Sequence, residues 1–352
     1  MQLLRNYNWL LTSVILLGIA FFVIWRHGSS LVLFSFVTET PETESSTTVQ
    51  KKEIHKPLFA YSATVLGNKV VGKVFNRQWY DYLERLKLTD VFIQQTLPDE
   101  QIFSKEPEFV TAFDESHYEH GIRLIRNIAS EFPGRNITVY NLGLNSKHKE
   151  TIRNYSHVVF KNFPMNQFPT YVSRLKEYRW KPLIIAEELT HFHSIFWLDS
   201  SALWHKSKDG LTPDYTPTVN AIKSGELYSH VMAERCGHSV FAATHPGMYD
   251  YLPIKRNLSK TREMYGACLQ LIYATKDVKQ NVLKWWVLCA LEKDCMGPAN
   301  SQLYCNFGND RMGRYGGCHR YDQSAVNILL LNRNLPKANY NVSIMALKLV
   351  RN

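Results

Sequence analysis

Between residues 108 and 198 the chain alternates short apolar runs with stretches whose apolar residues recur every three or four positions. The helical spacing covers residues 120–132 and 171–191, with Pro182 in the first turn of the second stretch or at a kink in it. Four apolar runs predict strands: Glu108–Ala112, Ile137–Leu142, His157–Phe160 and Ser194–Leu198. The resulting β-α-β-β-α-β order predicts an α/β fold with a mixed, mostly parallel sheet and helices on both faces.

The N-terminal segment from Trp9 to Trp25 contains no charged residue. As a helix it would reach roughly 25 Å, close to the thickness of a thin bilayer core. It is predicted to be a transmembrane signal-anchor. A cleaved signal peptide is the alternative, because length alone does not separate the two, although no small-x-small cleavage site follows the apolar run.

The rest of the N-terminal region has little to bury. Residues 38–57 are rich in Ser, Thr, Glu and Lys, a composition that does not recover its ordering entropy. The predicted organisation is a cytoplasmic tail at 1–8, an N-terminal transmembrane helix at 9–25, a stem at 26–57 and a lumenal α/β domain at 58–352, with its core at 108–332.

Cysteines and glycosylation sequons set the orientation. All six cysteines lie in the C-terminal third, which allows up to three disulfides in an exported domain. Four N-x-S/T sequons follow the apolar segment, at Asn136, Asn154, Asn257 and Asn341. Together they predict a single-pass type II membrane protein of the Golgi or endoplasmic reticulum.

Composition narrows the function further. The 352 residues are 45% hydrophobic and 20% charged, as in a folded protein, and no second spanning segment supports a transporter or channel. The net charge of +10 suits anionic ligands such as nucleotide diphosphates or acidic glycans, or simply a basic surface. The basic residues are scattered and the compartment is exported, so no nucleic-acid partner is expected.

An acidic side chain follows the most apolar strand directly. The run Ser194–Leu198 continues into Asp199, and a carboxylate there needs a cation or hydrogen-bond donors. Nucleotide-sugar transferases often place an Asp-x-Asp pair at this point to hold Mn²⁺ or Mg²⁺. Ser201 stands where the second acid would be. The alternative is that Asp199 only caps the loop.

Polar residues also follow the first strand. Thr111, Ala112 and Asp114 lie at its carboxyl end, where a nucleotide is expected in a parallel α/β sheet. In the alternative interpretation, Asp114 and Ser116 cap the next helix.

A third cluster precedes the last apolar helix. His319, Arg320, Asp322 and Gln323 combine a possible metal ligand, a cation and two hydrogen-bonding groups. They could bind a diphosphate or a sugar. Alternatively, Asp322 is the helix N-cap and Arg320 lies on the surface.

The chain resembles a nematode-expanded family of single-pass proteins known as a domain of unknown function, DUF1647. The resemblance rests on five stretches: FVTAFDESHYEHGIRLI (109–125), ITVYNLGL (137–144), YRWKPLIIAEEL (178–189), FWLDSS (196–201) and CHRYDQSAVNILL (318–330). Their layout is similar to that of GT-A nucleotide-diphospho-sugar transferases, especially the glycogenin-like ones.

That resemblance implies specific roles. Lys181 would contact the donor phosphate and Asp199 would bind Mn²⁺ or Mg²⁺. Asp322 and Gln323 would contact sugars, and His319 would be a further metal or phosphate contact. Ser201 departs from the metal-binding pair, which leaves the metal site of these enzymes incomplete here.

The leading hypothesis is a glycosyltransferase that moves a sugar from a nucleotide-sugar to a glycan or glycoprotein. Asp199, Asp322 and His319 are all candidates for the base that deprotonates the acceptor. The second hypothesis is a non-catalytic lumenal carbohydrate-binding protein, favoured by the lone acid at position 199. A hydrolase or sulfotransferase lacks its motif in this sequence.

Overall fold

The computed structural model describes residues 21–27, 30–36, 59–204, 214–333 and 347–349. The chain divides into two compact units, residues 1–55 and 56–352. In the first unit, the described residues form an antiparallel hairpin of β1 (Phe21–His27) and β2 (Ser30–Phe36).

The predicted anchor lies mostly outside the described residues. Its first part, residues 9–20, is not among them, and its last five residues belong to β1. Within the described ranges, no helix is both long enough and apolar enough to cross a membrane. The tail, the anchor and the stem therefore stay predictions.

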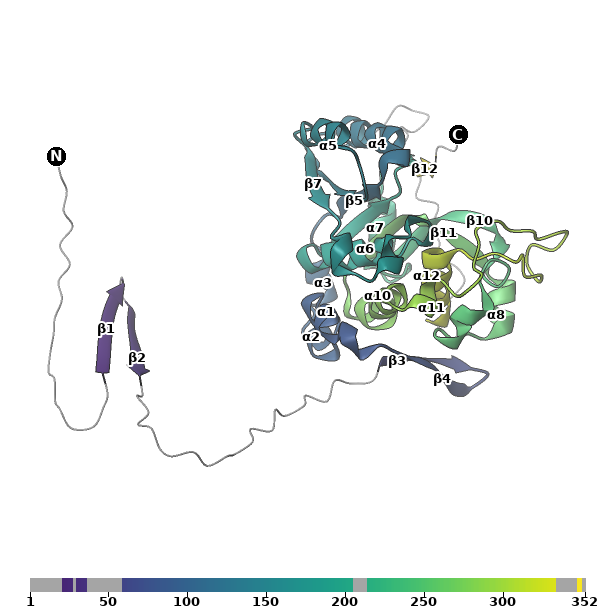
Figure 1. The fold of residues 1–352 in the computed structure, drawn as a ribbon, viewed down its shortest axis with the longest axis horizontal. Helices are drawn as coiled ribbons and strands as arrows, with labels where there is room; N and C mark the ends of the chain where they lie inside the picture. The colour runs from purple at the N-terminus through teal and green to yellow at the C-terminus, as the bar shows by residue number, and fades with distance from the viewer. Residues whose placement is uncertain (1–20, 28–29, 37–58, 205–213, 334–346, 350–352) are drawn as a thin grey trace. The chain divides into compact units, whose positions relative to one another are not determined.

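A six-stranded sheet of order β10-β11-β8-β5-β6-β7 forms the centre of the second unit (Figure 1). The pairs β5–β6, β6–β7 and β5–β8 are parallel, whereas β11 runs antiparallel to both β8 and β10. The predicted mixed α/β fold with a mostly parallel sheet is confirmed. The strands are β5 (Glu108–Phe113), β6 (Ile137–Asn141), β7 (Val158–Asn162), β8 (Ser194–Leu198), β10 (His230–Ser239) and β11 (Glu263–Tyr273).

Alternating side chains of the strands feed two separate cores. Phe109 and Phe196 pack with the apolar face of α4 (Tyr118–Glu131). Their neighbours Val110 and Trp197 belong to the other core. That core includes residues of three helices, α6 (Trp180–His191), α10 (Lys284–Leu291) and α12 (Tyr321–Asn332). Helices therefore cover both faces, as the period-two alternation requires.

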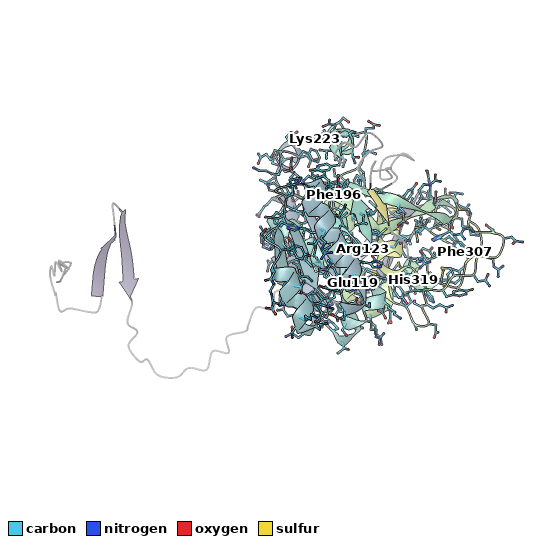
Figure 2. The ribbon with its side chains drawn as sticks, turned by 90° about the horizontal axis from the view of Figure 1, so that it is seen from above. Glu119, Arg123, Phe196, Lys223, Phe307 and His319 are labelled. Carbon is cyan, nitrogen blue, oxygen red and sulfur yellow. A yellow bond between two sulfur atoms is a disulfide. The ribbon has the colours of Figure 1, made fainter. Side chains whose placement is uncertain are left out.

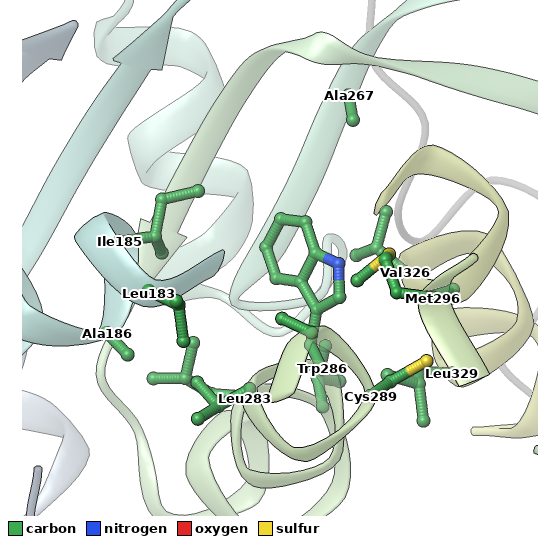
Figure 3. Packing of buried hydrophobic residues seen from close by; sticks show 14 of the residues in the cluster. Leu183, Ile185, Ala186, Ala267, Leu283, Trp286, Cys289, Met296, Val326 and Leu329 are labelled. Carbon is green, nitrogen blue, oxygen red and sulfur yellow. The ribbon is translucent and has the colours of Figure 1, made fainter. Parts of the chain in front are cut away.

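Trp286 of α10 lies at the centre of the second core. Figure 3 shows its ring between Leu183 of α6 and Val326 of α12. Its indole Nε1 donates a hydrogen bond of 3.0 Å to the backbone carbonyl of Asp322. This packing fixes the first turn of α12, which contains Asp322, relative to α6.

Two helical expectations needed correction. The helix predicted from residue 171 begins only at Trp180, because Pro182 tolerates only the first turn of a helix and Tyr178 has a φ of 53°. Short 3-10 turns take its place. A further helix, α5 (Ser146–Arg153), separates β6 from β7 and was missed, because Ile152 is its only buried residue.

Additional elements surround this framework. A hairpin of β3 (Phe59–Val65) and β4 (Asn68–Phe75) precedes it, and β9 (Ala202–Trp204) pairs with β12 (Leu347–Leu349). The remaining helices are α1 (Tyr80–Arg85), α2 (Asp90–Gln94), α3 (Asp99–Ile102), α7 (Thr216–Lys223), α8 (Arg256–Thr261), α9 (Lys276–Val278) and α11 (Lys293–Met296).

Two disulfides are present, where up to three were expected. They join Cys289 to Cys295 and Cys305 to Cys318. Cys236 and Cys268 remain thiols.

The close packing of α4 against β5 gives a stability test. A methyl group at Gly121 would overlap the ring of Phe113, so Gly121→Ala should destabilise the fold although alanine favours helix. We expect the free energy of unfolding, measured with urea, to fall by about 1–2 kcal/mol. Arg123→Ala, on the exposed side of the same helix (Figure 2), is the control. Equal stability of both variants would contradict the packing.

Candidate functional site

The carboxyl ends of the parallel strands meet at one edge of the sheet, and Asp199 follows β8 there. Its backbone N–H donates to the carbonyl of Cys268 on β11 at 2.8 Å. The indole Nε1 of Trp197 donates to its Oδ1 at 2.7 Å. The side chain of Asp199 is 29% exposed, so it is fixed by the sheet and still open to solvent.

One buried ammonium group joins Asp199 to Asp322. Lys181 Nζ, from the first turn of α6, lies 2.9 Å from Asp199 Oδ1 and 3.2 Å from Asp322 Oδ2. It also donates to the carbonyl of Ala267 at 3.2 Å. The side chains of Lys181 and Asp322 are 3% and 4% exposed. These three residues, here called the Lys181–Asp199–Asp322 group, bring α6, β8 and α12 to one point.

The electrostatics of this group follow from its burial. Burial alone would lower the pKa of Lys181, but Asp199 and Asp322 outweigh it and hold that pKa above its ordinary range. Burial raises the pKa of Asp322 to about 6, against the opposing effect of Lys181. One ammonium and two carboxylates give the group a formal charge of −1. Asp322 can therefore exchange a proton close to neutral pH.

The residues flanking Asp322 were also predicted. Gln323 is partly exposed, and its Nε2 lies 3.3 Å from the thiol of Cys236. Arg320 is partly exposed and occupies the N-cap position of α12. Asp322 lies inside the first helical turn, so the interpretation of Asp322 as the N-cap is wrong.

Two residues beside the group were missed by the sequence analysis. Cys268 Sγ donates to Glu234 Oε2 at 2.7 Å, and burial raises the pKa of this thiol well above its ordinary value. A Cβ on Gly266 would lie 2.9 Å from the same carboxylate oxygen, so the glycine leaves room for it. No local signal identified Glu234, because it reaches the site through the antiparallel pairing of β10 with β11.

The residues predicted at the end of β5 have different fates. The register of β5 with β8 places Val110 opposite Trp197, one position before the end of β8. Ala112 is buried on the same side of the sheet as Trp197. Thr111 is fully buried, and its predicted part in binding a nucleotide stays a prediction.

Asp114 lies beyond the end of β5 and is partly exposed. Its Oδ1 lies 2.6 Å from His117 Nδ1 and accepts a 2.8 Å hydrogen bond from Ser116 Oγ. Burial alone would raise the pKa of Asp114, but these two partners lower it. Asp114 stands at the N-cap position of a short 3-10 turn, although its side chain makes no hydrogen bond to the backbone there.

His319 does not fit the predicted role of metal or phosphate contact. It is fully buried, and its Nδ1 accepts from the N–H of His245 at 3.0 Å. Its Nε2 lies 3.1 Å from the carbonyl of Met296. Burial lowers its pKa to about 3. Both ring nitrogens are already used within the protein, which corrects the prediction.

The expected Mn²⁺ or Mg²⁺ does not fit the residues described. Among them, no group of three or more His, Cys, Asp or Glu side chains is placed to hold a metal ion. Asp199 is engaged by the Lys181 ammonium, and the partly exposed Ser201 offers only a hydroxyl in place of the second acid. No chemical step is therefore routed through a metal.

Comparison with known proteins agrees with the resemblance in the first part of the globular unit. The family described as "Protein of unknown function (DUF1647)" matches residues 48–186, which end within α6. A search of curated proteins found no match.

Three solved structures are similar to the chain at low identity. The WbbM bifunctional glycosyltransferase has a TM-score of 0.40 at 13% identity; the match covers 66% of this chain and 38% of that one. The galactosyltransferase LgtC, in complex with donor and acceptor sugar analogues, has 0.35 at 14%, covering 63% and 70%. The mannosyltransferase Ktr4p from S. cerevisiae, in complex with GDP, has 0.36 at 12%, covering 73% and 92%. These scores are too low to carry a functional argument, which rests on the site itself.

The raised pKa of Asp322 makes a prediction about stability and pH. Ionising this carboxyl is less favourable in the folded protein than in the unfolded chain. Its contribution to the free energy of unfolding therefore falls as pH rises from its ordinary pKa of 3.8 through about 6. Asp322→Asn removes this titration. The variant should gain up to about 3 kcal/mol relative to the parent protein across that window. Urea unfolding of both proteins between pH 4 and 7 measures it, and parallel profiles would contradict the assignment.

Proposed function

We propose that the second unit is a glycosyltransferase that moves a sugar from a nucleotide-sugar donor to a glycan or glycoprotein hydroxyl. The observation that carries the proposal is the Lys181–Asp199–Asp322 group, built at the carboxyl edge of parallel strands, where such sheets bind ligands. Charged side chains gathered with little exposure to solvent, at an edge where such sheets bind ligands, are typical of functional sites.

The chemistry divides among the residues of this edge. Asp199 is open to solvent and would accept hydrogen bonds from donor sugar hydroxyls, with Lys181 holding its carboxylate in place. In the transfer, the bond between the anomeric carbon and the diphosphate oxygen breaks, and a bond from the acceptor oxygen to that carbon forms. Asp199, the solvent-open carboxylate of the group, would take the acceptor proton, with Lys181 and the buried Asp322 holding it in position.

The departing diphosphate requires positive charge that the group itself, at −1, does not supply. Arg320 is partly exposed two residues before Asp322 and is the cation we assign to this task. Gln323, next to Asp322, would contact a sugar through its amide. Mn²⁺ enters the proposal only as a condition to vary in the assay.

The exported location is part of the same proposal. We place the unit in the lumen of the Golgi or endoplasmic reticulum, behind a type II membrane anchor. The two disulfides, Cys289–Cys295 and Cys305–Cys318, support an oxidising compartment.

The test is donor turnover by the full-length protein. Panels of UDP- and GDP-sugars are incubated with glycan acceptors, with and without Mn²⁺, and release of the nucleotide diphosphate is measured. Asp199→Asn should lower turnover about a hundredfold, because it removes a charge placed at the reacting sugar. Asp294→Asn, an exposed acid on α11, is the control and should leave turnover unchanged.

A second function has one observation in its favour. Ser201 in place of the second acid, with Lys181 already against Asp199, also suits a non-catalytic carbohydrate-binding protein on the same framework. If the protein binds glycans but neither binds nor turns over any nucleotide-sugar, this alternative is supported and the transferase is overturned.

A further inference from the structure

A cavity of about 480 Å³ lies apart from the Lys181–Asp199–Asp322 group, and none of these three residues lines it. It lies beside β7, the edge strand of the sheet, and takes residues from α1, β6, β7, α6 and the chain that follows β7. We call it the β7 cavity. Its size is within the range of sites for small organic ligands. The residues used below are Tyr82, Arg85, Lys161, Phe163, Gln167 and Phe168.

A fully buried carboxylate organises the polar side of the β7 cavity. Glu188 Oε1 accepts hydrogen bonds of 2.6 Å from Tyr140 Oη and from Lys161 Nζ, and both donors line the cavity. The side chain of Glu188 is 0% exposed. Its Oε2 has no hydrogen-bond partner among the described residues. The Tyr140 hydroxyl and the Lys161 ammonium are therefore held in fixed positions. Burying the Glu188 carboxylate that holds them has an energetic cost that packing alone does not require.

Aromatic rings form the apolar part of the lining of the β7 cavity. Phe163 and Phe168 are stacked with centroids 5.3 Å apart, and Tyr82 meets Phe168 edge-on at 5.4 Å. Arg85 lies over the Tyr82 ring at 4.8 Å. Such rings offer apolar contact to the C–H faces of a ligand.

Charge decides the class of ligand. Arg85 pairs with Glu187 at 3.2 Å and Lys161 pairs with Glu188 at 2.6 Å, so the charges around the cavity cancel. Among these four residues, an ionic ligand therefore finds no charge without a partner. Gln167 is exposed and lines the cavity, where its side-chain amide offers both a donor and an acceptor. A neutral ligand with many hydroxyls and apolar C–H faces matches this combination.

We propose that the β7 cavity is a second carbohydrate site, which holds one or two neutral sugar units. Its assignment to the acceptor glycan rests on the proposed transferase function, whereas sugar binding by the cavity does not. The site at the sheet edge would handle the reacting sugar, and the cavity would hold a more distant part of the same glycan.

The test is binding of neutral oligosaccharides to the full-length protein in a detergent without a sugar headgroup. An array of neutral oligosaccharides selects a probe, and titration of that probe gives its Kd. Gln167→Trp puts a large ring at an exposed position of the cavity lining and should weaken binding about tenfold or more. Gln101→Trp, at an exposed glutamine on α3 outside the cavity lining, is the matched control and should bind as the parent protein does.

The outcomes separate this proposal from the proposed function. Asp199→Asn should weaken oligosaccharide binding much less than Gln167→Trp does, and Gln167→Trp should leave nucleotide-sugar binding unchanged. Failure of every neutral oligosaccharide to bind, or equal binding by Gln167→Trp and the parent protein, would overturn the cavity site. Absence of donor turnover with normal oligosaccharide binding would overturn only the transferase.

Discussion

The site depends on one interaction, the contact of the buried Lys181 ammonium with the carboxylates of Asp199 and Asp322. A buried ammonium without partners would lose its proton, and two buried carboxylates without a cation would repel each other. Each of the three charged groups is stable in its position only because the opposite charge lies next to it. The three elements that carry them are consequently held together by charge as well as by the packing around Trp286.

The net charge of the Lys181–Asp199–Asp322 group also determines which ligand groups it favours. Two carboxylates outweigh one ammonium, and Glu234 adds a further acid across Cys268. Such a surface favours hydroxyl groups over phosphate at the group itself. A nucleotide-sugar would therefore place its sugar here and its diphosphate toward Arg320. For the β7 cavity, with its paired charges and aromatic rings, we propose the same preference for neutral sugars.

The sequence predicted the elements that hold apolar residues in a regular period. The run Ser194–Leu198 matches β8 at both ends, and the helix that follows Asp322 was expected in the right place. Asp199 was predicted from its position after that strand alone. Lys181 came from the family resemblance, because a single lysine on an apolar helix carries no signal of its own.

What could not be predicted depends on contacts between distant segments. Cys268 reaches Asp199 through the pairing of β11 with β8, and Glu234 reaches Cys268 through the pairing of β10 with β11. Such pairing leaves no periodic signature in any of the strands. His319 looked like a ligand in the sequence, yet bonds with His245 and Met296 consume both ring nitrogens. Thr111 lies between Val110 and Ala112, whose side chains pack in the same core as Trp197, and the alternation along a strand turns the buried Thr111 side chain to the other face.

The most direct test of the central contact is the ¹⁵N NMR titration of the Lys181 side chain in the full-length protein. If the ammonium is held by Asp199 and Asp322, Nζ stays protonated up to and beyond the ordinary lysine pKa of 10.5. Its protons should also exchange slowly with water, because the side chain is 3% exposed. Deprotonation of Lys181 below about pH 8 would show a buried amine without its two carboxylate partners and would contradict the account.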